Sequence, residues 1–212
     1  ENIFMKTQQV VNESLADSLD LNAIRFVVGL GGLSECGKSS IGLYLDDKRG
    51  INRIKIKHLM EKLELRYGAD QFPFEEGIYG IGKEVMTALF SERLSEYFSE
   101  RGISTAAIES LHNFEFTRNL KLFMGEKLRV VYVDTPREIR ILRNSKNFNG
   151  DLRESEREVN RKDKIKLSRG AAKIKGIADL VIDNSKSFEK TIDKLEDFLG
   201  IWKYQKHTII LS

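Results

Sequence analysis

The sequence predicts an α/β fold, a doubly wound parallel sheet of five strands with helices on both faces. Short apolar runs alternate with amphipathic segments along most of the chain, which is the pattern of repeated β-α-β units. A glycine-rich loop lies between the first apolar run and the first amphipathic segment. In such sheets, ligands bind at the carboxyl ends of the strands. We therefore expect the functional site at that edge.

The elements follow in order along the chain. Strands are predicted over residues 26–30, 53–56, 104–108, 129–133 and 180–182. Helices are predicted over residues 3–19, 38–47, 57–67, 83–100, 114–124, from 137 to 144, and 187–199. The segment 69–82 contains Pro73 and three glycines and is expected to be a loop. A highly charged stretch occupies 137–175.

The chain divides into three parts. Residues 23–200 hold all five expected strands and form the main domain. Residues 1–22 are expected to be an N-terminal helix or a linker, and residues 201–212 a C-terminal tail that adds an edge strand or a packing strip. Because the sequence begins with Glu1 rather than Met, an upstream domain in a longer chain is one alternative, and a homodimer is another.

Composition excludes several classes of protein. The net charge of +3 in 212 residues does not by itself indicate a nucleic-acid partner. No run approaches the ~20 apolar residues of a membrane span, and we identify no secretory leader. The single cysteine excludes an internal disulfide and fits a reducing compartment. We expect a cytoplasmic protein without membrane or nucleic-acid partners.

The glycine-rich loop has the spacing of a phosphate-binding P-loop, Gly32-x-x-x-x-Gly37-Lys38-Ser39. Its backbone N–H groups and the following helix N-terminus would bind an anion, and Lys38 would reach the β- and γ-phosphates. Ser39 would bind Mg²⁺. The expected cofactors are therefore ATP and Mg²⁺. Residues expected to contact the nucleotide are Gly32, Ser34, Glu35, Cys36, Gly37, Lys38, Ser39 and Ser40. The alternative is a glycine-rich turn with a solvated Lys38.

Later segments extend the comparison to a family. The third strand runs into Ala-Ile-Glu-Ser-Leu-His at 107–112, Arg140 and Arg143 follow the fourth strand, residues 160–163 read Asn-Arg-Lys-Asp, and residues 178–184 read Ala-Asp-Leu-Val-Ile-Asp-Asn. From about residue 26 to 199 the layout resembles the nucleoside monophosphate kinase superfamily. It is most similar to archaeal adenylate-kinase-like proteins and dephospho-coenzyme A kinases. The resemblance implies a sheet of P-loop kinase type with a small helical lid at about 144–169.

The resemblance also implies residue roles. Glu109 matches the carboxylate that holds the Mg²⁺ shell together with Ser39, although Ser110 replaces the family's glycine. Arg143 and Arg161 match lid arginines that stabilise phosphoryl transfer, and we expect the lid to be mobile until nucleotide binds. Asn184 ends the fifth-strand motif, and in dephospho-coenzyme A kinases the chain after this strand passes the adenine, so the resemblance implies a nucleotide contact for Asn184. The alternatives are a strand-end charge for Glu109, a solvated charged face for the arginines and a plain turn for Asn184.

The acceptor side departs from the family. His112 stands where many relatives have an arginine, and Glu61 lies near an expected arginine. Lys57 or His58 occupies the position of an aspartate that would take a proton from a hydroxyl acceptor. Other candidates for acceptor contact are Arg66, Lys83 and residues 77–82.

We therefore expect an ATP-dependent phosphotransferase that acts on a small molecule, a nucleoside monophosphate or a similar phosphorylated metabolite. Two alternatives stay open. One is a small-molecule hydroxyl kinase, similar to dephospho-coenzyme A kinase, with His58 or Glu61 as base. The other is a nucleotide-binding regulatory module of a larger protein.

Overall fold

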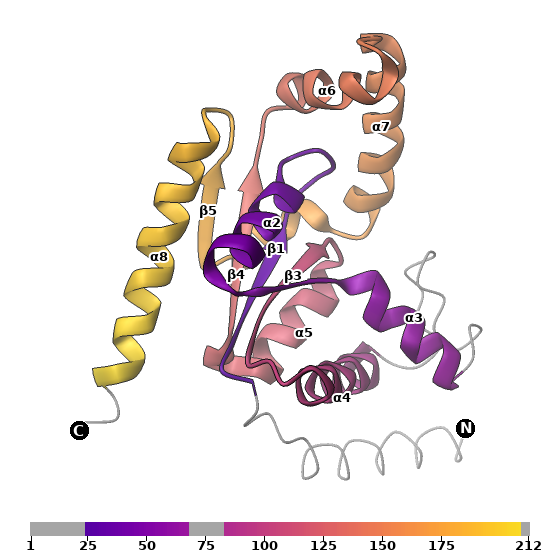
Figure 1. Cartoon of the computed structure of the whole chain (residues 1–212). Helices are drawn as coiled ribbons and strands as arrows, with labels where there is room; N and C mark the ends of the chain where they lie inside the picture. The colour runs from indigo at the N-terminus through magenta and orange to yellow at the C-terminus, as the bar shows by residue number, and fades with distance from the viewer. Residues whose placement is uncertain (1–23, 68–82, 209–212) are drawn as a thin grey trace.

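The computed structural model describes residues 24–67 and 83–208, with the strands at the centre of the molecule (Figure 1). The expected N-terminal helix or linker and the loop over 69–82, including the acceptor candidate at 77–82, lie outside the described residues. So does the side chain of Lys83.

The sheet has five parallel strands in the order β2-β3-β1-β4-β5, which confirms the predicted fold class. The strands are β1 (Phe26–Gly31), β2 (Asn52–Lys55), β3 (Thr105–Leu111), β4 (Leu128–Asp134) and β5 (Leu180–Asp183). Because β1 pairs with both β3 and β4, the loop that leaves β1 lies at the point where the strand order changes direction. Ligands bind at such a point in open α/β sheets.

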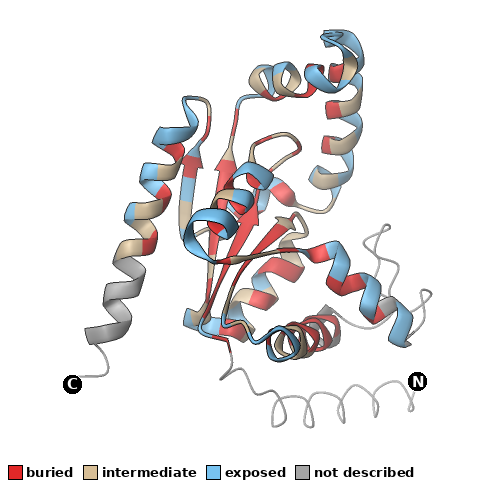
Figure 2. Cartoon of the chain, viewed as in Figure 1, coloured by how far each residue is buried: buried red, intermediate tan, exposed pale blue. Residues whose placement is uncertain are grey.

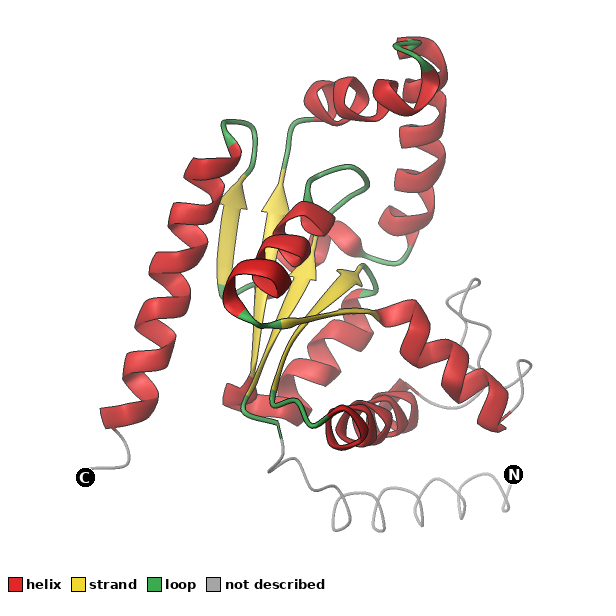
Figure 3. Cartoon of the chain, viewed as in Figure 1, coloured by secondary structure: helices red, strands yellow, loops and turns green. Residues whose placement is uncertain are grey.

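Helices surround this sheet (Figure 3). The α-helices are α2 (Lys38–Arg49), α3 (Ile56–Tyr67), α4 (Lys83–Arg101), α5 (Phe114–Met124), α6 (Arg137–Ser145), α7 (Leu152–Ser168) and α8 (Phe188–Thr208). Short 3-10 helices are η2 (Gly125–Lys127), η3 (Lys146–Phe148) and η4 (Ala171–Ile177). Helix α8 continues to residue 208, beyond residue 199, where the sequence predicted its end.

The strands alternate their apolar side chains between two core layers. Figure 2 shows the central strands as mostly buried. One layer joins the sheet to α3, α4 and α5, where the rings of Phe90 and Phe116 meet edge to face with centroids 5.0 Å apart. The other layer joins the sheet to α2 and α8. Both faces are therefore covered, as a parallel sheet requires.

Helices α6 and α7 pack on each other beyond the carboxyl ends of the strands (Figure 1). Asp151 caps α7 by accepting hydrogen bonds from the N–H groups of Arg153 and Glu154. Ser155 and Val159 are fully buried on one face of α7. The charged stretch therefore includes an amphipathic helix with a buried face.

Within residues 24–67 and 83–208, no helix combines the length and the apolar composition that crossing a bilayer requires.

Candidate functional site

The glycine-rich loop joins β1 to α2, and Lys38 folds back over it. The Lys38 ammonium donates to the carbonyl oxygens of Gly32 and Leu33, at 2.8 and 2.6 Å, and to Cys36 Sγ at 3.1 Å. Helix α2 begins at Lys38 without a side-chain cap. Its first N–H groups are therefore left for an anion, which is the geometry of a phosphate site.

The tip of the loop is fixed through the carbonyl of Cys36. This oxygen accepts hydrogen bonds from Asn184 Nδ2 at 2.8 Å and Thr135 Oγ1 at 2.9 Å. In a trans peptide the carbonyl and the next N–H point in opposite directions, so the N–H of Gly37 faces away from these donors. Gly37 has a φ of 105°, and a Cβ there would lie 2.2 Å from Asn184 Nδ2. Only glycine fits this position.

Asn184 therefore holds the loop through the Cys36 carbonyl and does not line the cavity in front of it. Its Oδ1 accepts from Thr191 Oγ1 at 2.7 Å, and the residue is 3% exposed. The resemblance places Asn184 near an adenine, whereas in this structure its buried amide contacts the loop and Thr191. Arg143, in contrast, faces the loop and donates from NH2 to the Asn184 carbonyl at 2.7 Å.

A cavity of about 440 Å³ lies in front of the loop. Its walls are Ser34, Glu35, Cys36, Gly37, Lys38, Ser39, Ser40, Ser110, Arg143, Lys162 and Lys166. Seven of these are consecutive loop and helix residues that the motif predicts, and Arg143 was also predicted. Gly32 and Asn184 do not line the cavity. Ser110, Lys162 and Lys166 were missed by the sequence reasoning.

Arg161, which the resemblance assigns to the lid, lies outside the cavity in this structure. Its side chain is 63% exposed and pairs with Glu158 on the same helix, with Nε 2.8 Å from Oε2. Lys162 instead faces the loop, with Nζ 3.2 Å from Glu35 Oε1. Residues one position apart on a helix point about 100° apart, so Arg161 points away from the loop when Lys162 points toward it. Helical spacing from Lys162 to Lys166, i to i+4, was the available signal.

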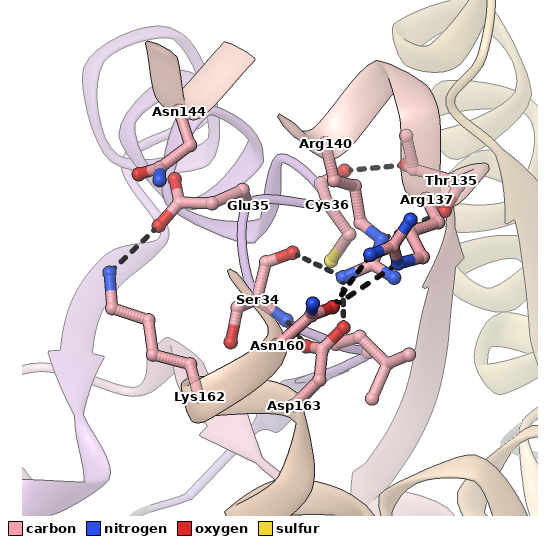
Figure 4. Close-up of polar contacts among 12 residues, drawn as sticks. Ser34, Glu35, Cys36, Thr135, Arg137, Arg140, Asn144, Asn160, Lys162 and Asp163 are labelled. Atoms are coloured by element: carbon pink, nitrogen blue, oxygen red, sulfur yellow. Dashed lines mark hydrogen bonds and ion pairs between the residues drawn. The ribbon is translucent and has the colours of Figure 1, made fainter. Parts of the chain in front are cut away.

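Asp163 joins the lid to the loop (Figure 4). Its Oδ1 accepts from the Ser34 N–H at 3.1 Å, and its Oδ2 accepts from Arg140 NH1 at 2.5 Å. Arg140 also donates to the carbonyls of Ser34 and Thr135, both at 3.1 Å. With Arg140 only 4% exposed, this is a buried ion pair whose polar atoms are satisfied. The lid is docked on the loop in this structure.

Ser39 and Glu109 lie together, as the metal assignment requires. Ser39 Oγ is 3.2 Å from Glu109 Oε2, and Glu109 is 2% exposed. Arg53 forms a two-pronged ion pair with the same carboxylate. In the described part of the chain, His, Cys, Asp and Glu side chains do not gather in groups of three or more that could hold a metal alone. A Mg²⁺ ion here would need phosphate oxygens and water as its other ligands, which is how Mg²⁺ is commonly held.

His112 is held neutral beside the cavity. Arg169 NH1 lies 2.9 Å from His112 Nε2, and Nδ1 lies 2.6 Å from the Ser110 carbonyl. Because arginine only donates, Nε2 accepts and Nδ1 carries the hydrogen. Burial and the Arg169 charge lower the pKa of His112 to about 4. Both ring nitrogens are occupied, so His112 has no free lone pair with which to act as a base.

The acceptor candidates on α3 lie elsewhere. His58 and Glu61 line a separate groove of about 460 Å³ between α3 and α4. Glu61 pairs with Lys57, and Arg66 makes two hydrogen bonds to Glu96 at 3.0 and 3.1 Å. None of these residues lines the cavity in front of the loop.

Comparisons with known proteins show the fold. No protein-family model matches the chain, and no curated protein matches it. Among solved structures, the crystal structure of TT1252 from Thermus thermophilus is similar, with a TM-score of 0.53 and 18% identity over 84% of this chain and 97% of that one. A likeness at this identity establishes an α/β architecture and leaves the chemistry to the site itself.

Proposed function

We propose that the chain is an ATP-dependent phosphotransferase that moves the γ-phosphoryl group to a nucleoside monophosphate or a similar phosphorylated small molecule. The observation that carries the proposal is the cavity, whose floor is the loop with Lys38 and whose other walls bring Arg143, Lys162 and Lys166. Phosphoryl transfer depends on positioning and on stabilising charge spread over phosphate oxygens. Converging cations and free backbone N–H groups supply both.

Mg²⁺ belongs to the same proposal. The Ser39 hydroxyl would bind the ion directly, and Glu109 would hold it through water. When bound, Mg²⁺ neutralises charge on the β- and γ-phosphate oxygens. The chain's own contribution is to hold these two oxygen ligands beside the loop, with Glu109 fixed by Arg53.

Glu35 in the cavity wall and Glu109 and His112 close to it are all paired within the described residues, which favours a phosphorylated acceptor. Glu35 pairs with Lys162, Glu109 is held by Arg53, and His112 is occupied at both nitrogens. A hydroxyl acceptor needs a base, whereas a phosphate oxygen is already anionic. The alternative of a hydroxyl kinase with His58 or Glu61 as base is less well supported, because both line the other groove.

We also propose that the protein is cytoplasmic, since one cysteine in 212 residues fits a reducing compartment.

Calorimetry of Mg-ATP with wild type and Lys38→Ala tests the binding step. We expect Lys38→Ala to weaken ATP binding by about tenfold or more, which is the loss of a charge-assisted contact. Lys48→Ala, on the exposed end of the same helix, is the matched control and should bind ATP as wild type does. Circular dichroism would show that both variants fold. Absence of ATP binding by wild type would refute the proposal.

Transfer of label from γ-labelled ATP tests the reaction. A panel of nucleoside monophosphates and alcohols distinguishes the acceptor classes. Label on a monophosphate supports the proposal, and label on an alcohol supports the hydroxyl kinase. ATP binding with no transfer to any acceptor would indicate the regulatory module instead.

A further inference from the structure

The ammonium of Lys166 and the hydroxyl of Ser34 belong to residues of the cavity wall, and neither group has a partner among the described residues. The Lys166 ammonium has no hydrogen bond or ion pair within residues 24–67 and 83–208. The Ser34 hydroxyl has a buried oxygen that is unsatisfied in the same part of the chain. Buried polar groups are almost always hydrogen-bonded, so the Ser34 hydroxyl indicates a missing ligand. Lys166 is half-buried and adds an unpaired positive charge to the same cavity wall.

Lys166 lies on the face of α7 that meets the loop. It follows Lys162 by four positions and Asp163 by three, so all three share one side of the helix. Lys162 contacts Glu35, and Asp163 contacts the Ser34 N–H. The pKa of Lys166 is lowered to about 8, first by burial and then by the charge of Lys38. Two ammonium groups therefore share one cavity, which is unfavourable until an anion lies between them.

Ser34 is held by its backbone. Its N–H donates to Asp163 and its carbonyl accepts from Arg140, while the residue as a whole is 2% exposed. Figure 4 shows the carbonyl directed toward Arg140 and the hydroxyl directed away from it. These two backbone hydrogen bonds hold the Ser34 main chain in place and leave its hydroxyl without a partner in the described part of the chain. An unpaired buried hydroxyl is unfavourable, so a ligand that accepts its hydrogen bond gains binding energy.

We propose that Lys166 and the Ser34 hydroxyl form the subsite for the terminal phosphoryl group of ATP. This inference rests on the proposed function and gives Lys166 the role that the sequence had suggested for Arg161. The other cations have partners: Lys162 pairs with Glu35, and Arg143 donates to the Asn184 carbonyl. Lys166 is therefore the cation that can bind a γ-phosphate without first breaking a hydrogen bond or an ion pair of this structure.

The subsite acts on one step. The bond between the γ-phosphorus and the oxygen bridging to the β-phosphate breaks, and its electron pair stays on that oxygen of ADP. An anionic acceptor oxygen supplies the pair for the new bond to phosphorus, so no proton moves. Lys166 and Ser34 donate hydrogen bonds to the outer γ-oxygens, where charge is spread in the transition state.

The test compares ATP with ADP by calorimetry in the presence of Mg²⁺. Lys166→Met should weaken ATP by about tenfold or more and leave ADP within about twofold, since a hydrogen bond to a charged group contributes about 1.5–3 kcal/mol. Ser34→Ala keeps both backbone contacts and should reduce the ratio of ATP to ADP affinity by about threefold to tenfold. Lys164→Met, at an exposed position of the same helix, should change neither affinity.

The outcomes separate the subsite from the function. Equal weakening of ATP and ADP by Lys166→Met, or no weakening of either, overturns the subsite while ATP binding by wild type keeps the proposed function. Failure of wild type to bind either nucleotide overturns the proposed function itself. A change in the Lys164→Met control equal to that of Lys166→Met would show a general loss of surface charge, and would also overturn the subsite.

Discussion

Ser39 Oγ lies 3.2 Å from Glu109 Oε2, although 70 residues separate the two in sequence. The approach depends on Gly42, one turn along α2 from Ser39. A Cβ at Gly42 would lie 2.1 Å from Glu109 Oε1, a distance that no real contact tolerates. The glycine therefore lets helix α2 pass close enough to the strand for the hydroxyl and the carboxylate to meet.

Gly42→Ala should destabilise the protein by about 1–3 kcal/mol, because the new methyl group overpacks against a buried carboxylate. It should also raise the Mg²⁺ concentration needed for nucleotide binding. Gly200→Ala is the matched control, since this helical glycine has open space around its Cβ position. Replacing glycine by alanine in an open helix position normally stabilises by up to about 1 kcal/mol. Urea unfolding of both variants measures the difference, and a stabilised Gly42→Ala would contradict the geometry.

Ser110→Gly should stabilise the protein by up to about 1 kcal/mol. Ser110 has a φ of 73°, which costs an L-residue about 1–2 kcal/mol. Glycine removes this strain, but it also increases the entropy of the unfolded chain, which offsets part of the gain in stability. The strain also gives a reason for the glycine that the resembling family has at this position. Asn149→Gly, at a φ of 51°, should gain less because asparagine tolerates this region. Equal gains in thermal unfolding would argue against strain at Ser110.

Much of this architecture could be predicted from sequence because it depends on local patterns. Helix α5 spans 114–124 as predicted, since Asn113 caps it and Gly125 ends it. The loop at 32–39 was found for the same reason, as its glycine spacing is a local property. The strand at 180–182 was predicted from an apolar run and appears as β5.

The cations of the lid could not be assigned in the same way. Which side chains of α7 face the loop depends on how α7 rotates against α6, and that is set by Val159 and Ser155 packing in a buried seam. Residues 161–163 read Arg-Lys-Asp, which favoured Arg161 in the comparison with the family. The packing of α7 instead places Lys162 and Lys166 in the wall of the cavity. The contact of Asn184 with the loop was not predicted either, because its partner Cys36 is 148 residues away in sequence.

Nucleotide affinity should fall as pH rises above about 8. Burial and Lys38 lower the pKa of Lys166 to about 8, while Cys36, Asp163 and Glu35 act in the other direction. A bound phosphate chain favours the charged ammonium, so binding takes up a proton when free Lys166 is neutral. Because one group titrates, nucleotide affinity can fall by at most about tenfold per pH unit. Calorimetry from pH 7 to 9 measures it. Lys166→Arg stays charged and should remove the dependence, and an unchanged dependence in this variant would assign it to another group.

Stability should fall as pH drops from about 6.5 toward 4. His112 has a pKa of about 4 in the folded protein, below the 6.5 of an unperturbed histidine. A base with a depressed folded pKa stabilises fully above the unfolded value, and this contribution is lost as the pH falls toward the folded value. The slope from this group is at most about 1.4 kcal/mol per pH unit. His112→Asn should flatten it in unfolding experiments. An equally steep slope in this variant would place the titration elsewhere.

Asp163→Ala should release the lid. The carboxylate accepts from the Ser34 N–H and from Arg140, so its removal leaves Arg140 buried without its charge partner. Loss of one partner from a buried ion pair costs about 3–5 kcal/mol. Because the break lies between α7 and the loop, we expect faster hydrogen exchange over 152–168 than in the sheet strands. Glu154→Ala breaks an exposed ion pair with Arg157 on the same helix and should cost less than about 1 kcal/mol. Added ATP should restore protection over 152–168 in Asp163→Ala if α7 also contacts the phosphates. Unchanged exchange in Asp163→Ala without nucleotide would show that the packing of α7 on α6, and not this carboxylate, keeps the lid docked.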